Sequence, residues 1–495
     1  MKDSDLTTLE TLLSANIEWL ITNPSGVPFP LRSGEIEIEK ASGKVLFSFP
    51  AKNGFQTWRI TGIEFDRPKI VLDLSRNFGN ENHRFELIPR ASAEEFSGAV
   101  EIARLKRVNN IARLLPAEFP GVKVIRAELN RENGRFAQIL IENNDRTYST
   151  VIADVSDTLS PEILLASAIF TKLRSGKNRK YAVSDVRILC EKRVANKLER
   201  LHACLNESWK RNIRLYKLSE CDSGSEISAV SDLSISDLWR SKPRKLHALK
   251  QRQLSKTAAE IKKLSPGEID HIYSKNGETL RYLGLPFLRS RNISGNEKIW
   301  FGVERARQTL DEGSIEDLYD LFEQLKKYRK HDPPNPQHLF YQMAPEAWLE
   351  SLLRQNIKLL DANLILSPIY NQFRTSQDKI DLLALRKDGR LVIIELKVSA
   401  DREMIFQAVD YWRKIELQRR SGVFNKAGLF GEAVISDKPA IVYLVAPTLG
   451  YHPDFDFLSK TLSTEIEIYR FDLAENWRKE IKVLRRSRVN HFARE

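Results

Sequence analysis

Alternating and continuous runs of apolar residues recur along the chain and predict several sheets interspersed with helices. Residues 35–88 alternate apolar and polar positions, as in GEIEIE and KVLFSF, and turn-forming Gly, Asn, Asp and Pro separate these runs. A helical period follows over about 93–115. Three strands of an antiparallel meander are expected next, at about 121–129, 135–142 and 147–154. A helix (161–173), a strand (183–190), a helix (194–208) and a strand (213–218) are expected after them.

The pattern changes at residues 219–238, where seven serines and five acids fill the segment. Such a composition can bury little apolar surface, so we expect a linker and a domain boundary there. Residues 242–263 then hold eight Lys or Arg and one acid on an expected helix, which either contacts phosphates or is a solvated helix face. The candidate phosphate contacts on this helix are Lys245, Lys250, Arg252 and Lys256.

These patterns predict a mixed α/β (α+β) protein of four parts, because the chain is too long for a single ordinary core. The parts are a β-rich N-terminal domain (1–90), an α/β domain (91–218), a linker with a basic helical region (219–335) and a C-terminal domain (336–495). The breaker HDPPNP at 331–336 precedes the last part.

Composition narrows the class of protein. With 42% hydrophobic and 29% charged residues, the chain is typical of a globular protein rather than a disordered or membrane-embedded one. Its apolar runs are shorter than the ~20 residues of a spanning helix, and the N-terminus lacks the apolar region of a signal peptide. Three cysteines without a CxxC pair fit a reducing cytoplasm. We therefore expect a cytoplasmic protein with no membrane contact.

The net charge of +12 favours a polyanionic partner without identifying one.

The most informative segment is KIDLLALRKDGRLVIIELKV. Two runs suited to strands, 379–386 and 391–398, flank a Lys-Asp-Gly-Arg turn, which predicts a β-hairpin. Glu395 and Lys397 lie two apart on the second strand and therefore share one face. Pairing within the hairpin then brings Asp381 beside them.

Two carboxylates and a lysine are costly in strands built for burial unless they pair or bind a cation. Phosphodiester hydrolysis needs a divalent ion held by oxygen atoms, which stabilises developing charge and acidifies a water. Asp381, Glu395 and the carbonyl of Leu396 can supply these oxygens. Lys397 can supply a cation near the water and the phosphate. The expected cofactor is Mg²⁺ or Mn²⁺.

In this order, the residues resemble the PD-(D/E)XK nuclease superfamily, whose core is a helix, three antiparallel strands, a helix and a strand. Ile380-Asp381 resembles the "PD" element, with isoleucine in place of the namesake proline, and Glu395-Leu396-Lys397 resembles E-x-K. The resemblance covers about residues 336–475. It implies a restriction-endonuclease-like fold of the RecB or Holliday-resolvase type and a metal-dependent nuclease acting on nucleic acid, with DNA favoured.

The resemblance also assigns residues on the two flanking helices. The acid of the first helix would be Glu346 or Glu350, and the position of Glu346 at the helix start favours it. Gln407 and Tyr411 resemble the Q-x-x-x-Y signature of RecB-type nucleases, where the pair supports the active site and contacts nucleic acid. The alternative is that these two are ordinary packing and capping residues.

The N-terminal half repeats the same order of expected elements. When the two series of elements are matched in order, STVIADVSD (149–157) corresponds to RLVIIELKV (390–398). Asp154 then stands at the position of the metal-binding glutamate, and Ser156 stands at the position of the lysine. The preceding strand, RFAQILIEN, offers no acid in its interior. We hypothesise a second core that kept the nuclease fold and lost its metal site. The alternative is an unrelated α+β domain.

The function predicted from the sequence is metal-dependent hydrolysis of phosphodiester bonds, and a homodimer is left open. One alternative is a non-catalytic nucleic-acid-binding or scaffold protein that retains a nuclease fold. Another is a ligand-activated defence nuclease with a sensor in the N-terminal half. The intact Asp381, Glu395 and Lys397 argue against the first alternative, and the absence of a Gly-rich phosphate loop gives the second no support.

Overall fold

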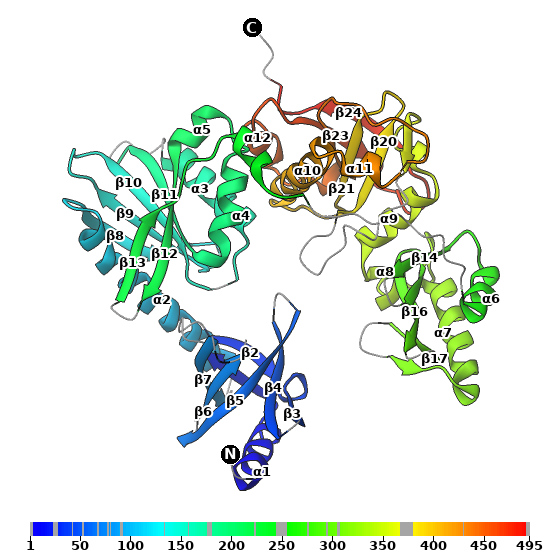
Figure 1. The fold of residues 1–495 in the computed structure, drawn as a ribbon, viewed down its shortest axis with the longest axis horizontal. Helices are drawn as coiled ribbons and strands as arrows, with labels where there is room; N and C mark the ends of the chain where they lie inside the picture. Colours follow the sequence, from blue (N-terminus) through cyan, green and yellow to red (C-terminus); the bar gives the residue numbers. More distant parts are fainter. Residues whose placement is uncertain are drawn as a thin grey trace. The chain divides into compact units, whose positions relative to one another are not determined.

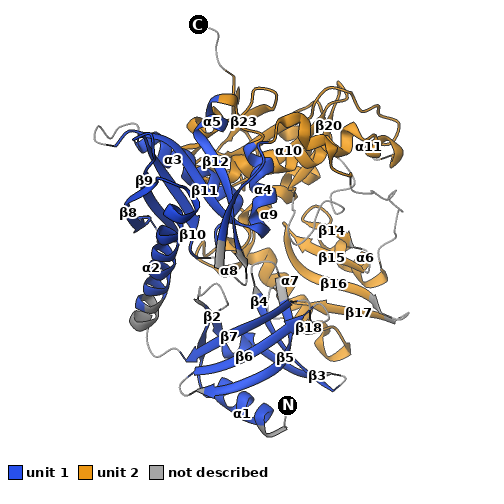
Figure 2. Ribbon diagram, turned by 60° about the vertical axis from the view of Figure 1, so that its left-hand side comes forward, with its two compact units in different colours: residues 1–202, 208–232 blue, residues 203–207, 233–495 orange. Residues whose placement is uncertain are grey.

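The protein, seen here as a computed structural model, consists of two compact units, residues 1–202 with 208–232 and residues 203–207 with 233–495 (Figure 2). It is a mixed α/β structure, and its described strands form four sheets (Figure 1). The residues described are 3–22, 28–41, 43–51, 54–66, 69–76, 79, 81–89, 93–132, 134–156, 158–175, 181–221, 224–243, 255–274, 277–293, 296–303, 307–366, 380–428 and 430–491.

The first sheet is antiparallel and has the order β2-β1-β7-β6-β5-β4-β3. Its strands are β1 (Glu18–Thr22), β2 (Pro28–Arg32), β3 (Glu37–Ala41), β4 (Lys44–Ala51), β5 (Gly54–Asp66), β6 (Lys69–Arg76) and β7 (Glu81–Pro89). Alternation along them buries Trp19, Phe47 and Trp58 on one face, against Leu9 of α1 (Asp3–Ser14). The β-rich character predicted for this part is therefore confirmed.

The second sheet is mixed and has the order β13-β12-β11-β10-β9-β8. Its elements are α2 (Ala93–Glu118), β8 (Lys123–Leu129), β9 (Phe136–Glu142), β10 (Tyr148–Asp154), α3 (Pro161–Ser175), β11 (Val183–Glu191), α4 (Lys192–His202), α5 (Glu207–Asn212), β12 (Ile213–Cys221) and β13 (Gly224–Ala229). The strands β8, β9 and β10 are antiparallel neighbours, as the meander pattern predicted.

The prediction of a linker at 219–238 is wrong. β12 continues to Cys221, β13 pairs with it antiparallel, and a 3-10 helix follows at Ile235–Arg240. Ile227 of β13 is buried in the core of the second sheet. The serines and acids of this segment are typical of a linker, which is why the composition predicted one. An edge strand, however, needs only one apolar face and can carry polar residues on the other.

The third sheet is antiparallel, in the order β14-β15-β16-β17-β18, and lies within the range predicted to be a basic helical region. Its elements are α6 (Lys256–Leu264), β14 (Ile269–Ser274), β15 (Gly277–Tyr282), β16 (Leu285–Ile293), β17 (Asn296–Phe301), β18 (Gln308–Thr309), α7 (Ile315–Tyr328) and α8 (Leu339–Gln342). This range therefore holds a folded α/β part rather than a helix beside a linker.

The fourth sheet is mixed and has the order β19-β20-β21-β22-β23-β24. Its elements are α9 (Pro345–Gln355), β19 (Leu364–Leu366), β20 (Leu382–Arg386), β21 (Leu391–Leu396), α10 (Met404–Arg420), α11 (Val423–Lys426), β22 (Ile441–Pro447), α12 (Phe455–Ser459), β23 (Glu467–Leu473) and β24 (Val483–Arg488). The predicted helix, three antiparallel strands, helix and strand are thus present in the predicted order.

The second and fourth sheets share one topology. In each, three antiparallel strands are followed by a helix, a fourth strand that pairs parallel to the third, a fifth that pairs parallel to the fourth, and an antiparallel strand at the edge. Each is also preceded by a helix, α2 or α9. The order of elements that the sequence suggested for the N-terminal half is therefore present in the structure.

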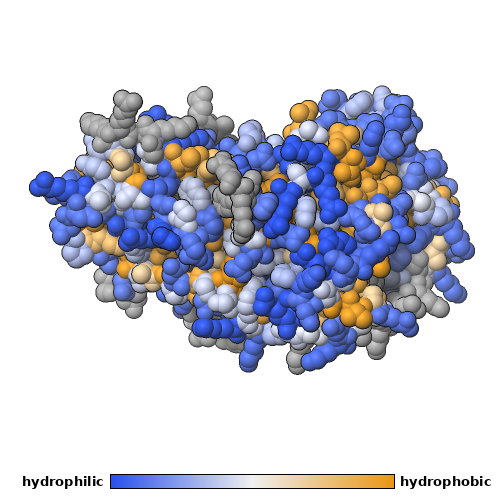
Figure 3. Space-filling model, turned by 90° about the horizontal axis from the view of Figure 1, so that it is seen from above, coloured by the Kyte–Doolittle hydropathy of each residue, from blue (hydrophilic) through white to orange (hydrophobic). Residues whose placement is uncertain are grey.

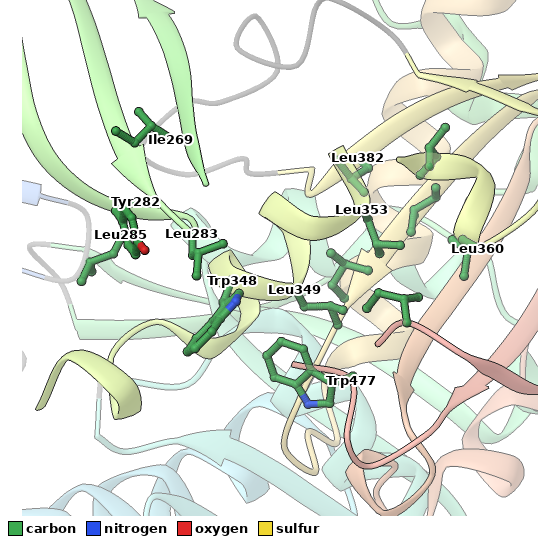
Figure 4. Packing of buried hydrophobic residues seen from close by; sticks show 14 of the residues in the cluster. Ile269, Tyr282, Leu283, Leu285, Trp348, Leu349, Leu353, Leu360, Leu382 and Trp477 are labelled. Atoms are coloured by element: carbon green, nitrogen blue, oxygen red, sulfur yellow. The ribbon is translucent and has the colours of Figure 1, made fainter. Parts of the chain in front are cut away.

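Helix α9 packs between the third and fourth sheets, which belong to one compact unit. A single buried cluster runs from Tyr282 and Leu283 of the third sheet, through Trp348 and Leu353 of α9, to Leu382 of β20 (Figure 4). Because these residues form one core, the two sheets stabilise each other through this helix.

Hydrophilic residues make up most of the face drawn in Figure 3, with hydrophobic residues gathered in smaller patches. The most exposed large apolar residues of the described chain are Ile17, Val434 and Leu449. None of the described helices is both long and apolar enough to cross a membrane.

Candidate active site at the end of a hairpin

The hairpin predicted from the sequence joins β20 and β21. The turn is closed by a hydrogen bond from Arg386 N to Arg390 O, and Gly389 takes a φ of +80°, which suits glycine. Leu382 pairs with Ile394, so Asp381, directly before β20, stands opposite Glu395. The hairpin therefore places the two acids side by side, as the period of two along the strands predicted.

The Asp381 carboxylate is buried and fixed by the backbone. Its Oδ2 accepts a hydrogen bond from Leu396 N at 2.9 Å. This contact ties the acid of one strand to the residue between Glu395 and Lys397 on the other, so the spacing of the three groups is set by main-chain pairing rather than by flexible side chains.

Glu395 is buried, with 3% of its surface exposed, and its Oε2 has no hydrogen-bond partner. Burial raises the pKa of this carboxyl, and the nearby Asp381 carboxylate raises it further, while Lys397 offsets part of the rise. Two acids in a dry site are unfavourable unless a cation neutralises them, and an orphaned buried oxygen is free to bind one.

The Lys397 ammonium is held by three side chains. It lies 3.4 Å from Glu395 Oε1 and 3.0 Å from Asp401 Oδ2, and it donates a hydrogen bond of 2.8 Å to Gln407 Oε1. Burial lowers the pKa of Lys397, but attraction to Glu395 and then Asp401 outweighs burial, so the pKa is raised. These contacts therefore hold the ammonium in place and favour its charged form.

Asp401 is a site residue that the sequence reasoning missed. It lies in the loop between β21 and α10, and its Oδ1 accepts a hydrogen bond from Glu403 N at 2.6 Å. The only signal in the sequence was an acid four residues after Lys397, which is too common to single out.

The helix α10 brings one of its two predicted residues to the site. Gln407 bonds directly to Lys397, whereas the half-buried Tyr411 has the Lys414 ammonium 5.7 Å from its ring centroid. The structure thus links Gln407 to the E-x-K element and shows Tyr411 beside a basic residue of the same helix.

The two acids of α9 have different surroundings. Glu350 is 1% exposed and pairs with Arg281 of β15 at 3.3 Å, so it is neither solvated nor open to a nucleic acid. Glu346 is half-buried in the first turn of the helix. The described residues contain no group of three or more His, Cys, Asp or Glu side chains suited to a metal, so Glu346 does not join Asp381 and Glu395 in such a group.

Of the four basic residues predicted to contact phosphates, Lys256 is the first residue of α6. Lys245, Lys250 and Arg252 lie outside the described residues.

The equivalent position in the second sheet has other contacts. The pairing of β9 with β10 puts Phe136 opposite Asp154, where the fourth sheet has Asp381 opposite Glu395. The Asp154 carboxylate accepts hydrogen bonds from Ser156 N, Ser156 Oγ and Leu159 N, at 2.8, 2.9 and 3.0 Å. This acid caps the loop after β10, and no second acid stands across from it.

The donor set at the hairpin end fits a hard divalent cation. Asp381 and Glu395 provide carboxylates, Leu396 provides a backbone carbonyl, and Glu395 Oε2 is a buried acceptor without a donor. Oxygen donors are what Mg²⁺ and Mn²⁺ prefer, and Mg²⁺ is commonly bound by only one or two protein carboxylates together with water and phosphate.

Comparisons with known proteins add little. No protein-family model matches the chain, and no curated protein matches it. Among solved structures, it is similar to EndoMS in its apo form, at 13% sequence identity over 38% of this chain and 85% of that chain, with a TM-score of 0.12. A TM-score this low carries no argument about function.

Proposed function

We propose that the protein is a Mg²⁺- or Mn²⁺-dependent nuclease that hydrolyses phosphodiester bonds in DNA. The observation that carries the proposal is the buried Asp381–Glu395 pair with an orphaned carboxylate oxygen, next to a fixed Lys397 cation. Two carboxyl groups this close in a core are costly to stability unless cations compensate them, and a divalent ion would add to the compensation that Lys397 provides.

Each residue has a defined part in the reaction. Asp381, Glu395 and the Leu396 carbonyl would hold the metal, and a divalent ion bound there would supply charge stabilisation at the phosphate and lower the pKa of a water. The Lys397 ammonium lies 3.4 Å from Glu395 Oε1 and would orient a water against the scissile phosphate. Asp401 and Gln407 keep the Lys397 ammonium in place.

The proposal is tested by incubating labelled linear, circular and single-stranded DNA with the protein in Mg²⁺, in Mn²⁺ and in EDTA. Cleavage is expected with either metal and not in EDTA. Asp381→Ala, Glu395→Ala and Lys397→Ala should each lower the rate by at least ~10²–10³-fold, because each removes charge stabilisation in the transition state.

The second sheet offers matched controls. Asp154→Ala and Ser156→Ala change the topologically equivalent positions of β10 and its loop, and both should cleave at the rate of the wild-type protein. A Lys397→Ala variant that cleaves at the wild-type rate would show that the assigned site is not the active site.

A further inference from the structure

The two faces of the third sheet differ in what covers them. On one face, Lys262 of α6 contacts His271 at 3.0 Å, and Phe322 of α7 packs edge-on against Tyr282. Successive side chains of a strand point to opposite faces, so Thr279 and Arg289, which pair across β15 and β16, belong to the other face. Helices α6 and α7 therefore pack on the first face and do not cover the second.

Basic and aromatic side chains gather on that second face. Arg289 and Arg291 of β16 stand opposite Trp300 and Lys298 of β17, and Arg307 immediately precedes β18. Arg289 and Trp300 are half-buried, while the other three are exposed. We call these five residues the basic face.

The charges of the basic face are not neutralised within the described chain. None of its four cations forms an ion pair with a described residue. The acid on this face of the described strands is Asp270, which is already bonded to Arg281 and to Ser351 of α9. Burial, followed by repulsion from Arg307 and Arg291, lowers the pKa of Arg289. Crowded cations without acids create a positive field that attracts a polyanion.

The same face also carries the contact with the candidate nuclease domain. Arg281 and Asp270 lie on it, and both bond to α9, through Glu350 and Ser351. α9 is the first helix of the fourth sheet's domain and shares its core. A polymer bound to the basic face is therefore held by the same compact unit that contains Asp381 and Glu395.

We propose that the basic face binds a single strand of nucleic acid, with its four cations along the phosphates and Trp300 stacked on an unpaired base. The identity of this polymer rests on the function proposed above. A half-buried tryptophan among cations favours a single strand over a duplex, because bases paired within a helix do not expose their faces for stacking.

The test is binding of a fluorescent oligothymidylate in EDTA at several salt concentrations, which needs neither metal nor cleavage. The variant Arg291→Gln/Lys298→Gln/Arg307→Gln should flatten the slope of log K against log salt by about 2, since each phosphate contact on a single strand contributes about 0.7. Trp300→Leu should weaken binding by about tenfold and leave the slope unchanged.

The matched control is Lys263→Gln/Lys326→Gln/Lys327→Gln, which removes three exposed positive charges from α6 and α7. It should bind with the wild-type slope, and all variants should retain the wild-type thermal midpoint. An unchanged slope in the first triple variant, or an equal change in the control, overturns the proposal, as does a blunt duplex that binds more tightly than the single strand. Loss of binding in the basic-face variant beside normal cleavage in Lys397→Ala would instead uphold the binding face and reject the proposed active site.

Discussion

The Lys397 ammonium contacts two carboxylates and an amide oxygen, so more than one neighbour fixes its position. A cation that must meet a phosphate loses effectiveness when it can rotate away. Positioning errors near 1 Å can cost about a hundredfold in rate.

Asp401→Asn is therefore expected to slow cleavage by roughly tenfold to a hundredfold, less than Lys397→Ala does, because Glu395 and Gln407 still hold the lysine. Single-turnover rates at saturating DNA measure this effect. Glu403→Gln is the neighbouring control, and a rate for Asp401→Asn equal to the wild-type rate would show that the contact is dispensable.

His202 at the end of α4 should make the free energy of unfolding of the first unit depend on pH. Burial lowers its pKa from 6.5, although its Nε2 lies 2.8 Å from Ile213 O and Asp232 is nearby. Below about pH 6.5 the unfolded chain binds a proton that the folded chain does not. The free energy of unfolding should therefore fall as the pH drops through this range, by at most about 1.4 kcal/mol per pH unit.

Urea unfolding between pH 5 and 7.5 measures this loss, and His202→Gln should reduce it. If the variant and the wild-type protein lose stability in parallel, another group is responsible.

At this scale, the sequence was informative where residues lie close along a hairpin. Asp381, Glu395 and Lys397 were predicted together because a two-residue period and one turn fix their positions. The pairing of Glu350 with Arg281 spans 69 residues of sequence, and no local pattern indicated it.

At the scale of elements, the contact between α9 and the third sheet depends on Arg329. This guanidinium is fully buried after α7 and donates hydrogen bonds to backbone carbonyls of Tyr282, Leu283, Phe340, Met343 and Ala344. Burial, followed by repulsion from Arg478, lowers the pKa of Arg329 to about 9. Its charge is satisfied by carbonyl dipoles rather than by an acid.

Arg329→Met should destabilise the second unit by at least about 3 kcal/mol, because carbonyls that accept from this guanidinium, such as those of Leu283 and Met343, lose that donor and each such loss in a buried site costs about 1–3 kcal/mol. Differential scanning calorimetry measures the change. Lys326→Met, which removes the same charge from an exposed position one turn earlier, should alter stability by less than about 0.5 kcal/mol.

Helices and strands could be predicted where the apolar residues recur with a strong period. They were missed where the overall composition of a segment outweighed its periodic pattern. β13 lies in the segment predicted to be a linker, because the serines and acids of 219–238 outweigh apolar residues such as the buried Ile227. The third sheet was missed because the basic residues before it suggested one helix, although ETLRYLGLPFLRSR alternates in a way that suits strands.

At the scale of the whole molecule, one topology occurs twice, with opposite chemistry at the matching position. Asp154 accepts three hydrogen bonds from its own loop, whereas Asp381 faces a second acid. Asp154 therefore stabilises its domain, whereas Asp381 lowers stability in the absence of a cation.

Asp154→Ala should therefore lower the free energy of unfolding by about 1–3 kcal/mol and leave cleavage intact. Asp381→Asn should abolish cleavage and leave stability without metal unchanged or increased. Melting curves in EDTA, paired with cleavage assays in Mg²⁺, test both halves. Equal destabilisation by the two substitutions would contradict this contrast.

The packing of α9 into one core with the third and fourth sheets has a consequence for motion. Elements that share a buried helix open together, so the slowest amide protons of β16 and of β21 should exchange with solvent at a common free energy. A nucleic acid that protects the strands of the third sheet would then slow exchange in the hairpin of Asp381 and Glu395 as well, even where it does not touch that hairpin.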